Sequence, residues 1–247
     1  MTALLEGKAA LVTGGSRGIG AAAALRLAED GADVAVTYHS DERAAGEIVE
    51  RIKGLGRRAL AIRADNADAE AVRDAVGRTA AEFGRLDILV NNAGVGVLGP
   101  IGDIASADID RVLAVNVRAP YLAAQAAVEH LSDGGRIITI GSCMAERVAF
   151  PGGSLYAMSK SAMAGLTKGL ARELGPRGIT VNLVHPGPVD TDMNPADGEG
   201  GPAQAGLTAL GRFGRPSEIA ATVAHLAGPG GDYITGASIA VDGGFGV

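Results

Sequence analysis

Thr13-Gly14-Gly15-Ser16-Arg17-Gly18-Ile19-Gly20 is the segment of this chain that says most about its fold. It follows a short apolar run at residues 9–13, which predicts a buried strand, and it opens a helical pattern. There Gly14 permits a tight turn, Gly18 lets the backbone approach a pyrophosphate, and Gly20 lets the helix pack closely on the strand. The spacing is G-x-x-x-G-x-G rather than G-x-G-x-x-G. The free N–H groups of the helix start face the phosphates, so we predict a dinucleotide site with Gly14, Ser16, Arg17, Gly18 and Ile19 as cofactor-binding positions.

The rest of the chain repeats this alternation of short apolar runs and longer amphipathic stretches. Further strands are predicted at residues 34–37, 59–62, 88–90, 136–140, 180–184 and 238–241. Helical patterns cover residues 18–30, 41–54, 68–83, 108–117, 120–131, 154–174 and 216–227. Strands that are apolar throughout and alternate with helices predict an α/β fold, a doubly wound parallel sheet of about seven strands with helices on both faces.

No linker divides the chain, so we expect residues 1–247 to form a single Rossmann-type domain. Residues 194–206 form a long connection rich in Gly, Pro and Ala. Connections of that length often act as lids or binding loops. We therefore predict a mobile substrate loop at about residues 190–210.

Composition narrows the class of protein. The 247 residues are 47% apolar and 20% charged, which allows a sizeable core. The net charge of −6, the scarcity of aromatic residues and the lack of Trp argue against a nucleic-acid partner. The four histidines are widely scattered and no Cys/His cluster has metal-ligand spacing, so no metal is expected.

Location in the cell follows from the same residues. Cys143 is the single cysteine, so no intrachain disulfide can form, which suits a reducing cytoplasm. Residues 1–8 lack the pattern of a signal peptide. The Ala-rich run at residues 21–27 is too short to span a membrane. We expect a cytoplasmic protein without a membrane partner.

The end of the second predicted strand bears on the choice of dinucleotide. Tyr38 stands where an acidic residue would bond the ribose 2′-hydroxyl of NAD. Without that carboxylate, nothing repels a 2′-phosphate, and Arg17 is placed to pair with one. His39 and Ser40 can add hydrogen bonds, while the acidic residues that follow at 41 and 42 fit the first turn of a helix. The sequence favours NADP(H) over NAD(H).

Two more strand ends carry candidate cofactor residues. Asp65 and Asn66 follow the third strand, where a side chain can bond the adenine amino group, although Asp65 fits a helix cap almost equally well. Asn91-Asn92-Ala93-Gly94 ends the fourth strand, at the carboxyl edge where doubly wound sheets bind ligands. Asn92, Ala93 and Gly94 are therefore predicted to contact the cofactor.

Tyr156-Ala157-Met158-Ser159-Lys160 carries the candidate chemistry. Tyr156 and Lys160 lie four residues apart, so they share one face of a helix and are about 6 Å apart along its axis. An ammonium near a phenol favours the phenolate and lowers the pKa of the tyrosine. A tyrosine tuned in this way can serve as a general acid or base.

Taken together, the motifs resemble those of the short-chain dehydrogenase/reductase family. The matching segments are T-G-x-x-x-G-x-G at residues 13–20, N-N-A-G at 91–94, Ser142, Y-x-x-x-K at 156–160 and P-G-x-x-x-T at 186–191. They cover essentially the whole chain, in order and at the family's spacing. The resemblance implies an NAD(P)-dependent oxidoreductase, usually a homotetramer, with helices at residues 108–131 and 154–174 as the expected interface.

The resemblance also implies roles for individual residues. Asn116, Ser142, Tyr156 and Lys160 would form the catalytic tetrad. Tyr156 would exchange a proton with a carbonyl or alcohol substrate, and Ser142 would hold the carbonyl oxygen. Lys160 would bond the nicotinamide ribose and lower the pKa of the tyrosine, so Tyr156 and Lys160 also count as cofactor contacts. Asn116 would hold, through its backbone, a water that links Lys160 to solvent.

The segment after the sixth strand completes the expected cofactor site, with Pro186, Gly187, Val189 and Thr191 placed by the resemblance against the nicotinamide. His185, just before them, is expected to be a strand-end residue without chemistry. Substrate walls are expected from residues 94–98, 143–145, 150–155, 188 and 193, most of which are apolar. They favour a modest, mostly hydrophobic ketone or aldehyde, with Cys143 as a small apolar wall residue and Arg147 as a solvated side chain.

Within the family, some stretches resemble bacterial biofilm-dispersal mediators reported to bind cyclic di-GMP. These stretches are residues 109–111, 134–137 and 175–197. Acyl-carrier-protein ketoreductases and fungal naphthol reductases resemble the chain somewhat less. Two alternatives to a carbonyl reductase therefore stay open: a regulatory protein that binds a cyclic dinucleotide, and a 3-oxoacyl-carrier-protein reductase. An acyl-carrier-protein reductase needs a basic docking patch near the site entrance. Arg118 and Arg147 are too few to decide whether such a patch exists.

Overall fold

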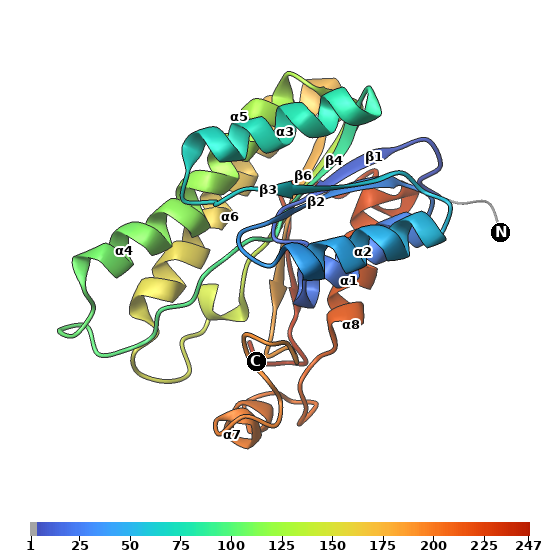
Figure 1. The fold of residues 1–247 in the computed structure, drawn as a ribbon. Coiled ribbons are helices and arrows are strands. Elements are labelled where there is room, and N and C mark those ends of the chain that lie inside the picture. The colour runs from blue at the N-terminus through green and yellow to red at the C-terminus, as the bar shows by residue number, and fades with distance from the viewer. Residues whose placement is uncertain (1–3) are drawn as a thin grey trace.

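The structure is a computed structural model that describes residues 4–247. A seven-stranded parallel sheet forms its centre. Residues 1–3 of the segment examined for a signal peptide lie outside the described residues. The strand order is β3-β2-β1-β4-β5-β6-β7. The first three strands are therefore added toward one edge of the sheet and the last four toward the other, with the switch between β1 and β4 (Figure 1). The strands are β1 (Ala9–Val12), β2 (Asp33–Tyr38), β3 (Ala59–Arg63), β4 (Leu86–Asn91), β5 (Leu131–Ile140), β6 (Thr180–Pro186) and β7 (Ser238–Val241).

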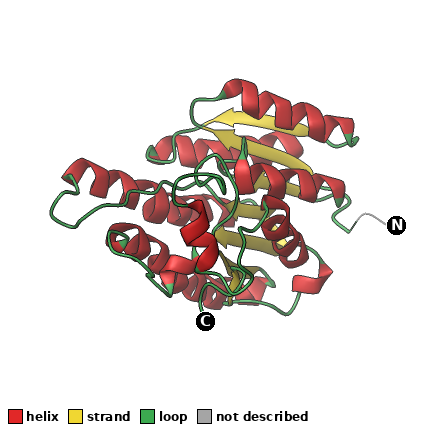
Figure 2. Cartoon of the chain, turned by 90° about the horizontal axis from the view of Figure 1, so that it is seen from below, coloured by secondary structure: helices red, strands yellow, loops and turns green. Residues whose placement is uncertain are grey.

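Helices cover both faces of the sheet, as the alternating pattern predicts (Figures 1 and 2). One apolar core joins the sheet to α1 (Gly18–Glu29), α2 (Glu42–Gly54) and α8 (Pro216–Ala227). A second core joins it to α3 (Ala69–Phe83), α5 (Ala119–Val128) and α6 (Ser154–Leu174). All residues of β1, β4 and β6 are buried, which explains why these strands are apolar runs rather than alternating ones. The α/β fold class is thus confirmed.

Smaller elements complete the chain. They are α4 (Ser106–Leu113), the π-helical segment η1 (Ala114–Arg118), α7 (Gly201–Gly206) and the 3₁₀ turns η2 (Cys143–Ala145), η3 (Gly175–Arg177) and η4 (Pro229–Gly231). Figure 1 shows α7 below the main body, in the connection that leads to α8. The predicted substrate loop therefore contains a short helix, and its mobility stays a prediction.

The prediction of two separate helices at residues 108–117 and 120–131 is wrong. Helical backbone runs without interruption through α4, η1 and α5, with Pro120 in the first turn of α5. The π turn, in which the Ala119 N–H donates to the Ala114 carbonyl, lies just before the proline, which cannot donate an amide hydrogen bond. The helix also ends earlier than predicted, because Leu131 is buried in β5, where it pairs with Leu86.

Helix caps settle two choices that the sequence leaves open. Asp41 caps α2, where its carboxylate accepts the Ala44 N–H, so this acidic residue belongs to the helix start. Asp68 caps α3 by accepting the N–H groups of Glu70 and Ala71. The alternative of Asp65 as the helix cap is therefore wrong. Among residues 4–247, none of the helices combines the length and apolarity needed to cross a membrane.

Candidate active site

A cavity of about 630 Å³ opens at the carboxyl ends of the strands, where doubly wound sheets bind ligands. It runs from the glycine-rich turn after β1 to the loops after β5 and β6. Every predicted cofactor position lines it, namely Gly14, Ser16, Arg17, Gly18, Ile19, Tyr38, His39, Ser40, Asp65, Asn66, Asn92, Ala93, Gly94, Tyr156, Lys160, Pro186, Gly187, Val189 and Thr191. The topology thus gathers segments that are far apart in the sequence.

Hydrogen bonds tie the glycine-rich turn to the end of β4. The Thr13 hydroxyl accepts the N–H groups of Asn92 and Ala93 at 3.0 and 3.1 Å. In return, the Asn92 side-chain amide donates to the carbonyls of Thr13 and Gly14 at 2.9 and 3.0 Å. A Cβ at Gly20 would lie 2.3 Å from the Gly14 carbonyl oxygen. Gly20 is therefore closely packed, as predicted, and it packs against the glycine-rich turn and the Asn92 side chain.

The far end of the cavity combines charged and polar side chains. Asp65 lies 3.7 Å from both His39 Nδ1 and Arg111 Nη1, and its carboxylate also accepts the Ala67 N–H. Arg111 comes from α4 and lines the cavity, although sequence reasoning missed it as a site residue. A signal was present, since Arg111 lies only five residues before Asn116 in the same continuous helical stretch.

Arg17 stands at the start of α1 with an exposed guanidinium. Its nearest acid is Asp192, at 4.0 Å, and both side chains face solvent. Such a pair is weak, so the guanidinium can exchange Asp192 for a phosphate. Arg17 therefore connects the glycine-rich turn with the loop after β6.

Three residues of the predicted tetrad, Ser142, Tyr156 and Lys160, line the other end of the cavity. Ser142 follows β5, and its Oγ accepts the Met144 N–H at 3.2 Å. Lys160 is buried, its Nζ donates to the Ile140 carbonyl at 3.0 Å, and it lies 5.8 Å from the centre of the Tyr156 ring. The helical spacing of four residues therefore does bring the ammonium to the phenol.

The acid–base properties differ from the expectation in one respect. Burial raises the pKa of Tyr156, while a hydrogen bond with Ser142 acts in the opposite direction. Burial also lowers the pKa of Lys160 to about 8. The expected lowering of the tyrosine pKa by Lys160 is therefore not seen, because burial sets the direction of the shift. The phenol keeps its proton at neutral pH.

Asn116 does not line the cavity but lies directly behind it. Its side-chain amide makes two hydrogen bonds with the Val95 backbone, each 2.9 Å long: Oδ1 accepts the N–H and Nδ2 donates to the carbonyl. It also donates to Ser159 Oγ at 3.0 Å. The residue sits in the π-helical segment, and Pro120 cannot supply the usual amide partner for its carbonyl.

The substrate side of the cavity is apolar. Cys143, Met144 and Phe245 form a small buried cluster with Phe150 and Leu207 packed against it. Burial raises the pKa of Cys143 to about 11, in keeping with a small apolar wall residue. The expected wall residues that line the cavity are Gly94, Val95, Gly96, Leu98, Cys143, Met144, Phe150, Pro188 and Met193, whereas Ala145, Leu155 and other neighbours do not.

Phe245 was missed as a wall residue because it lies about a hundred residues from the segments it contacts, and no local pattern marks it. Arg147 holds Phe245 in place. The guanidinium donates to the Phe245 carbonyl and stacks 5.4 Å from the centre of the phenyl ring. The prediction of a simply solvated Arg147 is wrong.

Comparisons with known proteins agree with this geometry. The family model described as enoyl-(acyl carrier protein) reductase matches residues 14–246. A short-chain dehydrogenase/reductase from Serratia marcescens BCRC 10948 has a TM-score of 0.97 and 56% identity, covering 99% of this chain and 100% of that one. The chain belongs to the short-chain dehydrogenase/reductase family. This confirms the resemblance found in the motifs.

Two other members of the short-chain dehydrogenase/reductase family are similar over nearly their full length. One from Burkholderia cenocepacia J2315, crystallised with NADP, has a TM-score of 0.98 and 57% identity, covering 99% of this chain and 100% of that one. The cyclic-di-GMP-binding biofilm dispersal mediator of Escherichia coli K12 is 46% identical over 97% of this chain and 98% of its own. The NADP complex agrees with the dinucleotide expected from the sequence.

Proposed function

We propose that this chain reduces a ketone or aldehyde to an alcohol with NADPH, or catalyses the reverse reaction. The observation that carries the proposal is the placement of Tyr156, Ser142 and Lys160 in one cavity with the glycine-rich turn. Family membership alone supports an oxidoreductase, and this arrangement supports the carbonyl reaction. A proton donor, an oxygen-binding hydroxyl and a buried ammonium meet beside a dinucleotide site.

The cavity fits NADP(H). No side-chain cap bond closes the start of α1, so its first N–H groups can face phosphates. Arg17 is exposed and weakly paired, so it is available to a 2′-phosphate. Tyr38 places no carboxylate against that phosphate. The NADP complex of the Burkholderia relative supports the same choice.

Bound NADPH supplies a hydride to the carbonyl carbon. In the proposed mechanism Tyr156 Oη gives its proton to the carbonyl oxygen, while the Ser142 hydroxyl donates a hydrogen bond to the same oxygen. A protonated Lys160 would hold the ribose hydroxyls of the cofactor, and its charge would stabilise the phenolate that remains. The Asn116 carbonyl, which lacks an amide partner from Pro120, is suited to hold a water beside Lys160 that returns the proton.

The walls favour an uncharged, mostly apolar substrate. Met144, Phe150 and Phe245 supply apolar surface, and Met193 and Leu98 flank the cavity with exposed side chains. Arg147 is engaged by the Phe245 backbone, so it is not free to bind an anionic substrate group.

A substrate panel tests the proposal. Purified protein should oxidise NADPH in the presence of activated ketones or aldehydes, and do so more efficiently than NADH. Tyr156→Phe should lower kcat by about a thousandfold, because general acid catalysis typically contributes ~10²–10⁴-fold, while NADPH binding is retained. Full turnover by the folded Tyr156→Phe protein would refute the mechanism.

A second candidate function is a regulatory protein that binds a cyclic dinucleotide. It is favoured by the 46% identity to the Escherichia coli mediator, whose name states cyclic-di-GMP binding. Calorimetry with cyclic di-GMP, with and without NADPH, separates the two candidates. Micromolar or tighter binding without turnover of any carbonyl would favour the regulator.

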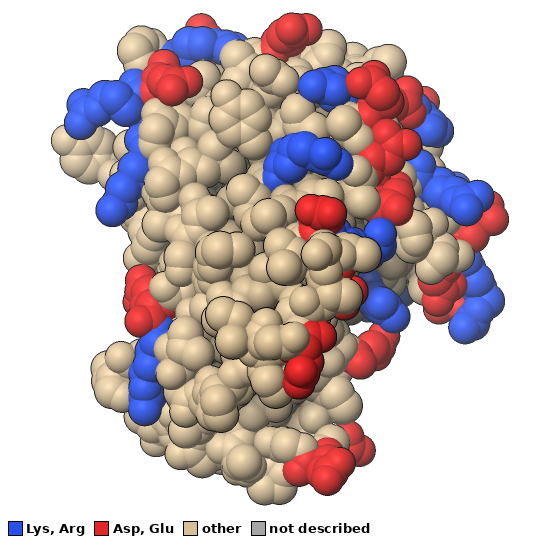
Figure 3. Space-filling model, turned by 90° about the vertical axis from the view of Figure 1, so that its left-hand side faces the viewer, with Lys and Arg blue, Asp and Glu red and all other residues tan. Residues whose placement is uncertain are grey.

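A third candidate, an acyl-carrier-protein reductase, is suggested by the description of the matched family model. It needs a basic docking patch, but Arg118 is bonded to the Ala67 carbonyl and Arg147 to that of Phe245. Figure 3 shows acidic and basic side chains interspersed around one face, whose centre is largely uncharged. These features make the carrier-protein reading the weakest of the three.

We also propose a cytoplasmic homotetramer, in line with the family and the single cysteine. Exposed apolar side chains on the expected interface helices support it: Leu113, Tyr121 and Met158 are 36%, 55% and 53% exposed. Light scattering after size-exclusion chromatography should give four times the 24.7 kDa chain mass.

A further inference from the structure

The backbone ladder between β5 and β6 stops just short of the catalytic serine. The last bond runs from the Gly141 N–H to the Val184 carbonyl, at 2.7 Å. In a parallel pair the next bond would come from residue 186, but Pro186 has no N–H to donate. The ladder therefore ends at the Gly141 carbonyl, and no β6 backbone group is shown bonded to the N–H of Ser142, the next residue.

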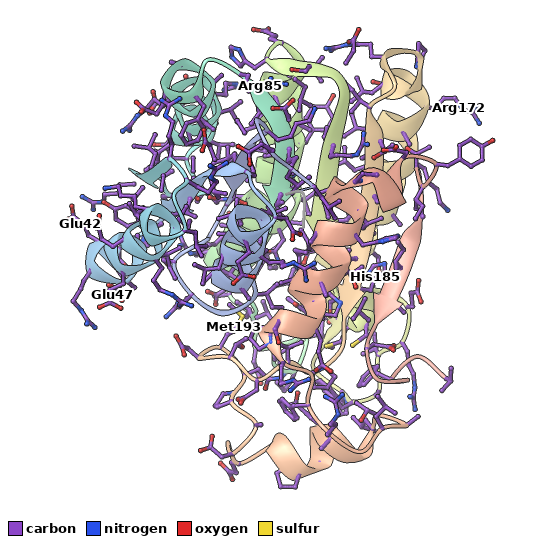
Figure 4. All side chains as sticks on the ribbon, turned by 90° about the vertical axis from the view of Figure 1, so that its right-hand side faces the viewer. Glu42, Glu47, Arg85, Arg172, His185 and Met193 are labelled. Carbon is purple, nitrogen blue, oxygen red and sulfur yellow. The ribbon has the colours of Figure 1, made fainter. Side chains whose placement is uncertain are left out.

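The imidazole of His185 is the partner of the Ser142 N–H. The side chain is 2% exposed, and its Nδ1 accepts the Ser142 N–H at 3.1 Å. The ring lies so close to Gly141 that a Cβ there would be 2.5 Å from Nδ1. Figure 4 shows His185 near the end of the sheet that faces the loop of Met193, with Arg85 toward the opposite end. The histidine thus completes the sheet edge beneath the active site.

This contact fixes the backbone from which the Ser142 hydroxyl projects. With the Ser142 N–H held by His185, its Oγ accepts the Met144 N–H at 3.2 Å. That bond occupies a lone pair and leaves the hydroxyl proton for a substrate oxygen. We propose that His185 is a positioning residue that aims the Ser142 hydroxyl at the carbonyl, an inference that rests on the proposed function.

Only the neutral imidazole can play this part, since a proton on Nδ1 would face the Ser142 N–H, donor against donor. The charged groups around the ring are the Glu146 carboxylate, 4.0 Å from Nε2, together with Lys160 and Asp242. Burial lowers the pKa of His185 and Lys160 acts in the same direction, while Glu146 and Asp242 oppose them. The positioning is therefore complete at neutral pH and is lost as the pH falls through the pKa of His185.

Three variants test the role. His185→Ala should lower kcat about ten- to hundredfold with little change in the KM for NADPH, because a small misplacement at a reacting centre costs up to ~10²-fold. His185→Asn, whose Oδ1 can accept the Ser142 N–H without titrating, should recover most of that loss and remove the acid limb from the pH profile of kcat. His130→Ala, an exposed and remote histidine, is the control and should behave as the unaltered protein.

Wild-type kcat and an unchanged acid limb in folded His185→Ala would overturn the inference. So would a folded His185→Asn protein as slow as the alanine variant, since ring volume rather than hydrogen-bond acceptance would then matter. If the unaltered protein turns over no carbonyl, the proposed function fails separately, and ¹⁵N NMR still decides the contact. The chain has only four histidines, so their NMR signals can be assigned. The chemical shift of the Ser142 amide should follow the titration of His185, and an amide shift independent of that titration would overturn the inference.

Discussion

The two halves of the cavity are built in different ways. The half near β1 and β4 is made largely of backbone, and the reciprocal bonds of Thr13 and Asn92 hold it together. The half near β5 and β6 is walled by side chains such as Met144 and Phe245, which come from segments distant in sequence. The first half is held by hydrogen bonds of its own, whereas the shape of the second depends on side chains that a few substitutions can change.

This contrast explains why a sequence indicates the type of reaction more readily than the substrate. Backbone cradles require glycines at defined spacings, so they leave local motifs in the sequence. Apolar walls require only bulk and hydrophobicity, which many residues supply. Substitutions in the first half should therefore change cofactor binding and rate, and substitutions in the second should change substrate preference.

The largest effect is expected where the two halves meet. Lys160→Met should lower kcat/KM by about 10²–10³-fold, the range for losing one electrostatic group in a reaction centre. Since burial places the pKa of Lys160 at about 8, the ammonium is present below that pH and lost above it. The kcat/KM of the unaltered protein should therefore fall as the pH rises through about 8, and the variant should lack this limb. Lys168→Met, on the exposed side of the same helix, is the matched control. A variant that keeps the alkaline limb would assign it to another group.

Gly20→Ala tests the rigidity of the first half. The added methyl would lie 2.3 Å from the Gly14 carbonyl oxygen and 2.4 Å from Asn92 Nδ2, so the turn must move. Overpacking costs about 1–3 kcal/mol, and NADPH should bind up to about 100-fold more weakly by fluorescence titration. Gly46→Ala, a helical position with nothing within 4 Å, should bind normally and gain stability. Unaltered NADPH affinity in Gly20→Ala would show that the cradle can adjust.

Arg17→Ala separates the two dinucleotides. Losing a charge-assisted hydrogen bond costs about 1.5–3 kcal/mol, so NADPH affinity should fall about ten- to hundredfold while NADH affinity hardly changes. Calorimetry with both cofactors measures the ratio. Arg43→Ala, which removes an exposed arginine paired with Glu47 on α2, should leave the ratio intact. Equal losses for both cofactors would place the guanidinium on the pyrophosphate instead.

The smallest effect is expected in the substrate loop. Asn194 and Gln204 exchange two side-chain amide hydrogen bonds, at 2.9 and 3.0 Å, which close the loop around α7. Gln204→Ala should raise the substrate KM two- to fivefold, about 0.5–1 kcal/mol, and leave the NADPH affinity unchanged. Gln125→Ala, exposed on α5, is the control. A change in NADPH affinity instead of KM would mean that the loop belongs to the cofactor half.

Sequence patterns predicted most of the sheet and many of the residues that line the cavity, since period, glycine spacing and strand ends are local signals. The continuous helix through Pro120 was missed because a π turn absorbs the proline, and propensity alone does not show this. The wall position of Phe245 depends on the contact with Arg147, far away in the chain. The proposed positioning role of His185 depends on its contact with Ser142, 43 residues away in the chain, which no local pattern predicts.

The contact between Arg147 and the last residues also matters for anyone who fuses or immobilises this protein. Phe245 lines the substrate chamber, and two residues later Val247 is 93% exposed. A tag or surface linker added there would leave from the rim of the chamber and could shield it. Leu4 and Leu5 lie instead beside Lys8 and Asp87, where β1 and β4 begin, so attachment on that side keeps the entrance open.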